Sequence, residues 1–178
     1  LESIQDLHLL TSKPILYVCN VDENTIKSGN KHVDAVKEVV KDEDAEILLI
    51  ATSIESEISE LDDFEEQQMF LEEMGLKKPG VHHLIQSTYK LLNLQTYFTA
   101  GVKEVRAWTI TKGMKAPQAA GVIHTDFEKG FIRAEVISYN DFSTLESELS
   151  CKESGKMKVQ GKDYIVKDGD VMHFLFNV

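Results

Sequence analysis

Short apolar runs alternate with helically spaced segments over the first ninety or so residues. Ile15 to Cys19 is an apolar run that follows a proline, and Ile47 to Ala51 is a second run. Apolar runs of this length are typical of strands buried on both faces. Between them, Asn30 can cap a helix on which valines recur at helical spacing, at Val33, Val36, Val39 and Val40. The order strand, helix, strand predicts an α/β unit.

Two more helices are predicted before residue 93. Ser59 can cap a helix that extends to Met74 and ends at Gly75, a residue type common just after helices. Pro79 can open another helix with an apolar side, since proline fits the first turn. We expect a domain boundary at Asn93, where this pattern stops.

Shorter, alternating segments follow residue 93. Residues 103–110 and 131–137 alternate at period two, and a closing strand over 171–176 follows the turn at residues 168–170. A short helix is predicted from Ala116 to His124. Strands arranged around one helix predict a small α+β domain of the β-grasp type. The chain should therefore contain two domains, residues 1–92 and 93–178.

Charge is distributed unevenly between these halves. The formal net charge is −11, and residues 1–92 contain 19 acidic and 8 basic side chains, whereas residues 93–178 contain 11 of each. A phosphate-rich partner would be repelled by the first half only. Four basic residues close in sequence could contact ribosome or RNA, with Trp108 and Phe131 as stacking platforms: Lys103, Arg106, Lys112 and Lys115. The alternative is that the lysines are ordinary surface residues and that Trp108 belongs to the core.

Other partners and sites are not indicated by the sequence. No apolar run approaches the roughly 20 residues that span a bilayer, so we predict a cytoplasmic protein with no membrane association. We also predict no DNA partner. The start of the chain has neither a methionine nor a leader, which indicates truncation at the front. Cys19 and Cys151 form no Cys-x-x-Cys pair, so neither a metal site nor a disulfide is predicted.

The first apolar run ends in a tetrapeptide with candidate chemistry, Asn20-Val21-Asp22-Glu23. In a guanine-reading loop of the form Asn-Lys-x-Asp, the asparagine holds the N7 edge of the purine and the aspartate accepts two donors unique to guanine. Here Val21 replaces the lysine and Glu23 replaces the aspartate. The longer carboxylate cannot take the same position, so guanine selectivity should weaken and adenine could be accepted.

The position of this tetrapeptide strengthens a nucleotide-binding interpretation. Ligands of open α/β sheets bind beyond the carboxyl ends of strands, which is where Asn20 lies. Thr52, Ser53 and Ile54 follow the next apolar run and could contribute backbone contacts to the base. The alternative is an ordinary polar turn after a strand.

Residues that handle phosphates or catalyse a reaction are not identified. Residues 75–80 have the glycine spacing of a phosphate loop, but Val81 and His82 follow where lysine and serine or threonine are required. We find no ligand placed for Mg²⁺, so this chain alone should not hydrolyse nucleotide. His124 and Asp126 would indicate a hydrolase only beside a nucleophile, and none is identified.

Longer segments resemble one known family. The tetrapeptide, residues 94–101 with 105–109, residues 120–127 and residues 163–174 together resemble the YchF family, the Obg-like ATPases. The resemblance covers nearly the whole chain. It implies that residues 1–92 are the C-terminal part of a P-loop ATPase domain of the Obg type with trailing helices. Residues 93–178 would then be a TGS domain of ubiquitin-like β-grasp fold.

The resemblance also implies a function. The intact family protein would bind and hydrolyse ATP with Mg²⁺, and would bind ribosomes and act in translation. Asn20 and Glu23, with Val21 beside the base, would correspond to the loop that prefers ATP to GTP. The alternative is a stand-alone interaction module, in which residues 93–178 recognise a protein or RNA and the first half has no nucleotide function.

Overall fold

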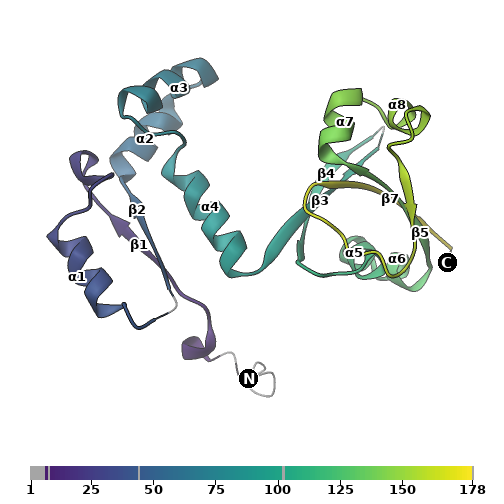
Figure 1. The fold of residues 1–178 in the computed structure, drawn as a ribbon, viewed down its shortest axis with the longest axis horizontal. Helices are drawn as coiled ribbons and strands as arrows, with labels where there is room; N and C mark the ends of the chain where they lie inside the picture. Colours follow the sequence, from purple (N-terminus) through teal and green to yellow (C-terminus); the bar gives the residue numbers. More distant parts are fainter. Residues whose placement is uncertain (1–6, 8, 44, 102, 178) are drawn as a thin grey trace. The chain divides into compact units, whose positions relative to one another are not determined.

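The chain divides into two units, residues 1–92 and residues 93–178 (Figure 1). Asn93, where the sequence pattern changes, begins the second unit. The structure is a computed structural model that describes residues 7, 9–43, 45–101 and 103–177. Each unit has its own apolar core and is described separately below.

A pair of parallel strands forms the centre of the first unit. Strand β1 (Leu16–Asn20) pairs with β2 (Glu46–Ile50) in a register that runs from Leu16 opposite Glu46 to Asn20 opposite Ile50. A short 3-10 helix, η2 (Leu10–Ser12), precedes β1. Helix α1 (Lys31–Val39) connects the strands, and the Asn30 carboxamide oxygen accepts the amide N–H groups of the first turn, as the sequence predicted.

Three helices follow β2, and they correct the prediction of one long helix from Ser59. Helix α2 (Thr52–Glu60) begins directly after the strand, and Ser59 lies in its last turn. Helix α3 (Phe64–Glu73) starts anew because the Asp63 carboxylate accepts the amide N–H of Glu65 at 3.1 Å and so acts as its N-cap. Gly75 follows this helix at φ +63°, which a glycine accommodates without strain. Thr52 and Ser53, which the sequence placed just after the second apolar run, form the first turn of α2.

Helix α4 (Gly80–Leu91) completes this unit and packs against β2. Pro79 precedes it, as predicted, and has no side chain that could accept a hydrogen bond. Instead, the Glu55 carboxylate of α2 accepts the amide N–H groups of Gly80 at 2.6 Å and Val81 at 3.2 Å. The core of the unit contains Ala51, Ile54, Ile58 and Leu71.

A five-stranded sheet organises the second unit, in the order β4-β3-β7-β5-β6. The strands are β3 (Leu94–Ala100), β4 (Val105–Thr111), β5 (Phe131–Ser138), β6 (Lys158–Gln160) and β7 (Asp170–Phe176). Only the β3–β7 pair is parallel; the other named pairs are antiparallel. The predicted strands correspond to β4, β5 and β7, whereas β3 and β6 were not expected.

Helices cover both faces of this sheet. Helices α5 (Ala116–Ile123), which the sequence predicted, and α6 (Thr125–Lys129) lie over the core that contains Tyr97 and Phe174, whose rings meet edge to face at 5.8 Å. The Tyr97 hydroxyl donates to the carbonyl oxygen of Ala119 in α5 at 2.9 Å. On the opposite face, α7 (Tyr139–Leu145) and α8 (Glu148–Glu153) cover Ile137 and Val171. Within the described ranges, no helix is both long and apolar enough to cross a membrane.

Candidate functional site

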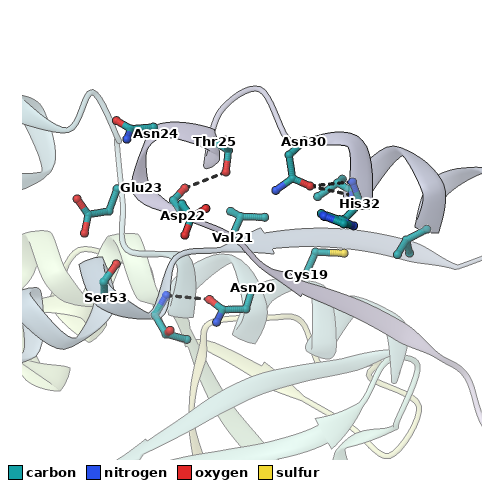
Figure 2. A pocket seen from close by; sticks show the side chains of 13 residues that line it. Cys19, Asn20, Val21, Asp22, Glu23, Asn24, Thr25, Asn30, His32 and Ser53 are labelled. Carbon is teal, nitrogen blue, oxygen red and sulfur yellow. Dashed lines mark hydrogen bonds between the residues drawn. The ribbon is translucent and has the colours of Figure 1, made fainter.

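A pocket of about 1090 Å³ opens at the carboxyl end of β1. Figure 2 shows it from close by, with Glu23 and Ser53 toward one end and Asn30 and His32 toward the other. Its walls come from β1, from the loop that follows β1, from α1 and from the start of α2. The lining residues are Cys19, Asn20, Val21, Asp22, Glu23, Asn24, Thr25, Asn30, His32, Val33, Val36, Thr52 and Ser53.

Asn20 connects the two strand ends. Its side-chain oxygen Oδ1 accepts the backbone N–H of Thr52 at 3.1 Å, which Figure 2 marks with a dashed line. The backbone N–H of Val21 donates to the carbonyl oxygen of Ile50 at 2.8 Å, which keeps the two strand ends aligned. With Oδ1 engaged by Thr52, the Nδ2 amide is the part of Asn20 that can donate to a bound molecule.

Glu23 is placed by a tight turn. The Asp22 carbonyl oxygen accepts both the backbone N–H of Thr25 at 2.9 Å and its Oγ1 hydroxyl at 3.0 Å. These bonds close a short 3-10 helix, η3 (Glu23–Thr25), in which Glu23 is exposed at the edge of the pocket. Glu23 and Asn20 line the same pocket, and a carboxylate acceptor together with an amide donor suits the polar edge of a heterocyclic base.

Five of the predicted base-site residues line this one pocket: Asn20, Val21, Glu23, Thr52 and Ser53. Ile54 does not line it. Its side chain is only 1 % exposed and packs with Ile58 and Leu71, because α2 begins at Thr52 and turns its third residue toward the core. We therefore leave Ile54 out of the proposed base site.

The sequence interpretation missed the wall formed by α1. Asn30 was identified only as a helix cap, yet it also lines the pocket together with His32, Val33 and Val36. A signal was available, because a helix that follows a strand must turn its apolar stripe toward that strand. Val33 and Val36 belong to that stripe, so the start of α1 has to lie near the end of β1.

The four basic residues predicted to contact RNA do not form one patch. Lys103 and Arg106 lie at one end of β4, and Lys112 and Lys115 lie just beyond the other end. Seven residues at about 3.3 Å each place these ends about 20 Å apart. Lys115 is also paired with Asp163, at 2.7 Å between Nζ and Oδ1. The two stacking candidates differ as well, because Phe131 is only 4 % exposed in the core whereas Trp108 is half-buried.

The remaining candidate residues have structural roles. His124 Nδ1 accepts the backbone N–H of Asp126 at 3.2 Å, so His124 acts as the N-cap of α6. His173 of β7 is exposed and lies on the face of the sheet opposite Met172 and Phe174. Among the residues that the structure describes, no group of three or more histidine, cysteine or acidic side chains is placed to hold a metal ion.

Comparisons with known proteins assign the chain to a class. Residues 94–177 match the family model YchF-GTPase_C, whose description is "Protein of unknown function (DUF933)". The ribosome-binding ATPase YchF of Escherichia coli O157:H7 is 56 % identical over 176 residues, which cover 99 % of this chain and 48 % of that protein. The protein of the same name from Bacillus subtilis (strain 168) is 54 % identical over 177 residues, covering 98 % and 48 %.

Solved structures agree with this class. The YchF GTPase of Schizosaccharomyces pombe superposes with a TM-score of 0.83 at 36 % identity, over 98 % of this chain and 46 % of that one. A GTP-binding protein from Pyrococcus horikoshii OT3 superposes with a TM-score of 0.62 at 14 % identity, over 99 % of this chain and 55 % of that one, which shows a shared fold only. The chain belongs to the YchF family and corresponds to its C-terminal part. It spans about half the length of the curated relatives it matches.

Proposed function

We propose that this chain provides the adenine-recognising edge of an ATP site in its first unit and a ribosome- or RNA-binding TGS domain in its second. Both would serve a cytoplasmic YchF-type ATPase. The proposal rests chiefly on Asn20, whose Oδ1 is bound to Thr52 so that its Nδ2 amide can donate at the pocket. The curated relatives are named ribosome-binding ATPases, which supports the second part.

The chemistry of the pocket fits one edge of ATP. Purine N7 is an acceptor and would receive the Asn20 Nδ2–H. The exocyclic amine of adenine is a donor, for which the Glu23 carboxylate at the pocket edge is a suitable acceptor. Guanine needs a carboxylate placed for two parallel bonds, and the longer glutamate side chain does not match that geometry. Val21 and the first turn of α2, with Thr52 and Ser53, would flank the base.

ATP hydrolysis would need groups beyond these. Phosphoryl transfer depends on a phosphate-binding loop and on Mg²⁺. In the family such groups would hold the triphosphate, and the sequence of this chain contains no phosphate-loop motif. We infer that the chain by itself binds ATP weakly and does not hydrolyse it.

The topology of the second unit supports the TGS assignment. A β-grasp domain wraps a mixed sheet around one principal helix. Here the parallel pair β3–β7 lies in the centre of the sheet, an antiparallel partner flanks it on each side, and α5 packs on one face. This arrangement presents its connecting turns to solvent, where a ribosome or RNA could bind.

Weak base binding can be measured residue by residue. We would titrate adenosine, ATP and GTP into the ¹⁵N-labelled chain and follow the side-chain NH₂ signal of Asn20 by NMR. The proposal predicts a saturable shift with adenosine that GTP does not exceed. In Asn20→Asp, Oδ1 can still accept from Thr52 but the donor is lost, so affinity should fall by roughly tenfold, about 1.4 kcal/mol. Tight, Mg²⁺-dependent GTP binding would contradict it.

A stand-alone interaction module remains the second candidate, because the family model matches only residues 94–177. Ribosome co-sedimentation of the chain with and without ATP, compared between the unmodified chain and Asn20→Asp, separates the two. The module would be favoured if ribosome binding changes neither with ATP nor with Asn20→Asp, and if adenosine causes no NMR shift of the Asn20 side-chain signal.

A further inference from the structure

A groove in the second unit has the make-up of a site for unpaired nucleotides. Its volume is about 520 Å³, and it runs along the end of the sheet that carries the β3–β4 turn. The groove lies where β7 extends past the end of β3, because these two seven-residue strands are offset along the sheet. Phe98 of β3 lies opposite Val171, so Ala100 is level with His173 and residues 174–176 continue past the end of β3.

Aromatic rings line both ends of this groove. At one end the half-buried Trp108 carries the Arg106 guanidinium over its ring, 4.1 Å from the ring centroid. At the other end Phe127 and Phe176 stack at 3.8 Å between centroids. Trp108 is held in place because its Nε1–H donates to Thr99 Oγ1 at 2.9 Å.

Charge at the rim indicates the chemistry of the occupant. Lys103 lines the groove at the β3–β4 turn and is exposed, as is Arg106 near the start of β4. Glu104 is the acidic side chain that lines the groove. Rings and a guanidinium plane offer stacking surfaces to bases of any sequence, while cations beside them attract phosphates. Duplex RNA keeps its bases stacked inside the helix and cannot use such surfaces.

We propose that this groove binds a short single-stranded segment of RNA, with a base stacked at Trp108 and Arg106 and backbone phosphate near Lys103. The inference rests on the proposed ribosome or RNA binding and names the form of RNA and the surface that takes it. It also accounts for the separation of the basic residues, since Lys103 and Arg106 lie at the groove and Lys112 and Lys115 lie beyond the other end of β4.

Trp108 is the only tryptophan of the chain and therefore reports on its own groove. We would titrate the 178-residue chain with five-nucleotide oligo(U) and oligo(A) and follow tryptophan fluorescence at two salt concentrations. Single strands should quench it saturably, and the same sequence paired in a duplex should bind at least about tenfold more weakly. An absence of saturable quenching up to about 1 mM RNA would overturn the proposal.

A matched pair of variants tests the assignment to the groove. Lys103→Gln, which removes the cation proposed to meet the backbone phosphate, should weaken binding by roughly 3–10-fold and lower the slope of log affinity against log salt by about 0.7, the value for one lost phosphate contact on a single strand. Arg133→Gln makes the same charge change on β5, at an exposed residue that does not line the groove, and should leave both quantities unchanged. Equal losses in both variants would show a general charge effect and contradict the site.

The same samples separate this inference from the proposed function. If the chain co-sediments with ribosomes but RNA leaves Trp108 unquenched, the groove assignment fails and the ribosome proposal stands. If ribosomal proteins freed of RNA quench Trp108 and the oligonucleotides do not, the occupant is a protein and the groove assignment is again wrong. Quenching by oligonucleotides without co-sedimentation would support the groove and contradict ribosome binding.

Discussion

Glu55 connects two helices of the first unit, and its removal should loosen the start of α4. The first amide N–H groups of a helix have no partner within the helix, and Pro79 at the N-cap position offers none. The Glu55 carboxylate accepts two of them, from Gly80 at 2.6 Å and from Val81 at 3.2 Å. It also places a negative charge at the positive end of the helix dipole. We predict that Glu55→Ala frees this end.

The expected size follows from these two bonds. Each hydrogen bond to a charged acceptor contributes about 1 kcal/mol when water can partly replace it, so Glu55→Ala should cost about 2 kcal/mol. Glu55→Gln keeps a neutral acceptor and should cost about 1 kcal/mol. In amide hydrogen exchange measured by NMR, about 2 kcal/mol corresponds to roughly 30-fold faster exchange at Gly80 and Val81, if both exchange through local opening.

A control on the same helix makes this test decisive. Glu57 is exposed on α2, so Glu57→Gln should change exchange at Gly80 by less than about twofold. If Glu55→Ala leaves both amides within twofold of the unmodified chain, the carboxylate does not hold the helix start and the reasoning is refuted. Helix α2 also begins at Thr52, the residue bound by Asn20. A confirmed effect would therefore show that the helix that contributes to the pocket wall also stabilises the start of α4.

Two further predictions concern the second unit. Tyr97→Phe removes the buried hydroxyl that donates to Ala119 at 2.9 Å, so it should cost about 1 kcal/mol and lower the melting temperature followed by Trp108 fluorescence by roughly 4–8 °C; an unchanged melt would contradict that contribution. Hydrogen bonds from Ser138 and then Lys156 lower the pKa of Asp141. Its ionised form therefore stabilises the fold above the ordinary carboxyl pKa of about 3.9, and this stabilisation is lost as pH falls through the lower folded value. Lys156→Gln should raise the pKa of Asp141 in a carboxyl NMR titration, and an unaltered pKa would show that the lysine has no part in it.

Local patterns predicted many of the elements correctly. The apolar runs at 15–19 and 47–51 became β1 and β2, and the Asn30 cap became the start of α1, because each depends on neighbours in sequence. The long helix from Ser59 failed for a local reason as well, since the Asp63 carboxylate starts a new helix and ends the continuity that the apolar spacing suggested. Strand β3 was missed because its residues are mixed in polarity and are fixed by pairing with β4 and β7.

The sequence by itself determined the family resemblance, the two-part organisation and the choice of Asn20 and Glu23, because these depend on residue identity and short-range spacing. Only the tertiary structure decided which atom of Asn20 is engaged, because its partner Thr52 is 32 residues away and is brought close by the parallel register. The same holds for the exclusion of Ile54, the contribution of α1 to the pocket, and the separation of Lys103 and Arg106 from Lys112 and Lys115. Each depends on the direction in which a helix or strand turns its side chains, which packing against distant segments fixes.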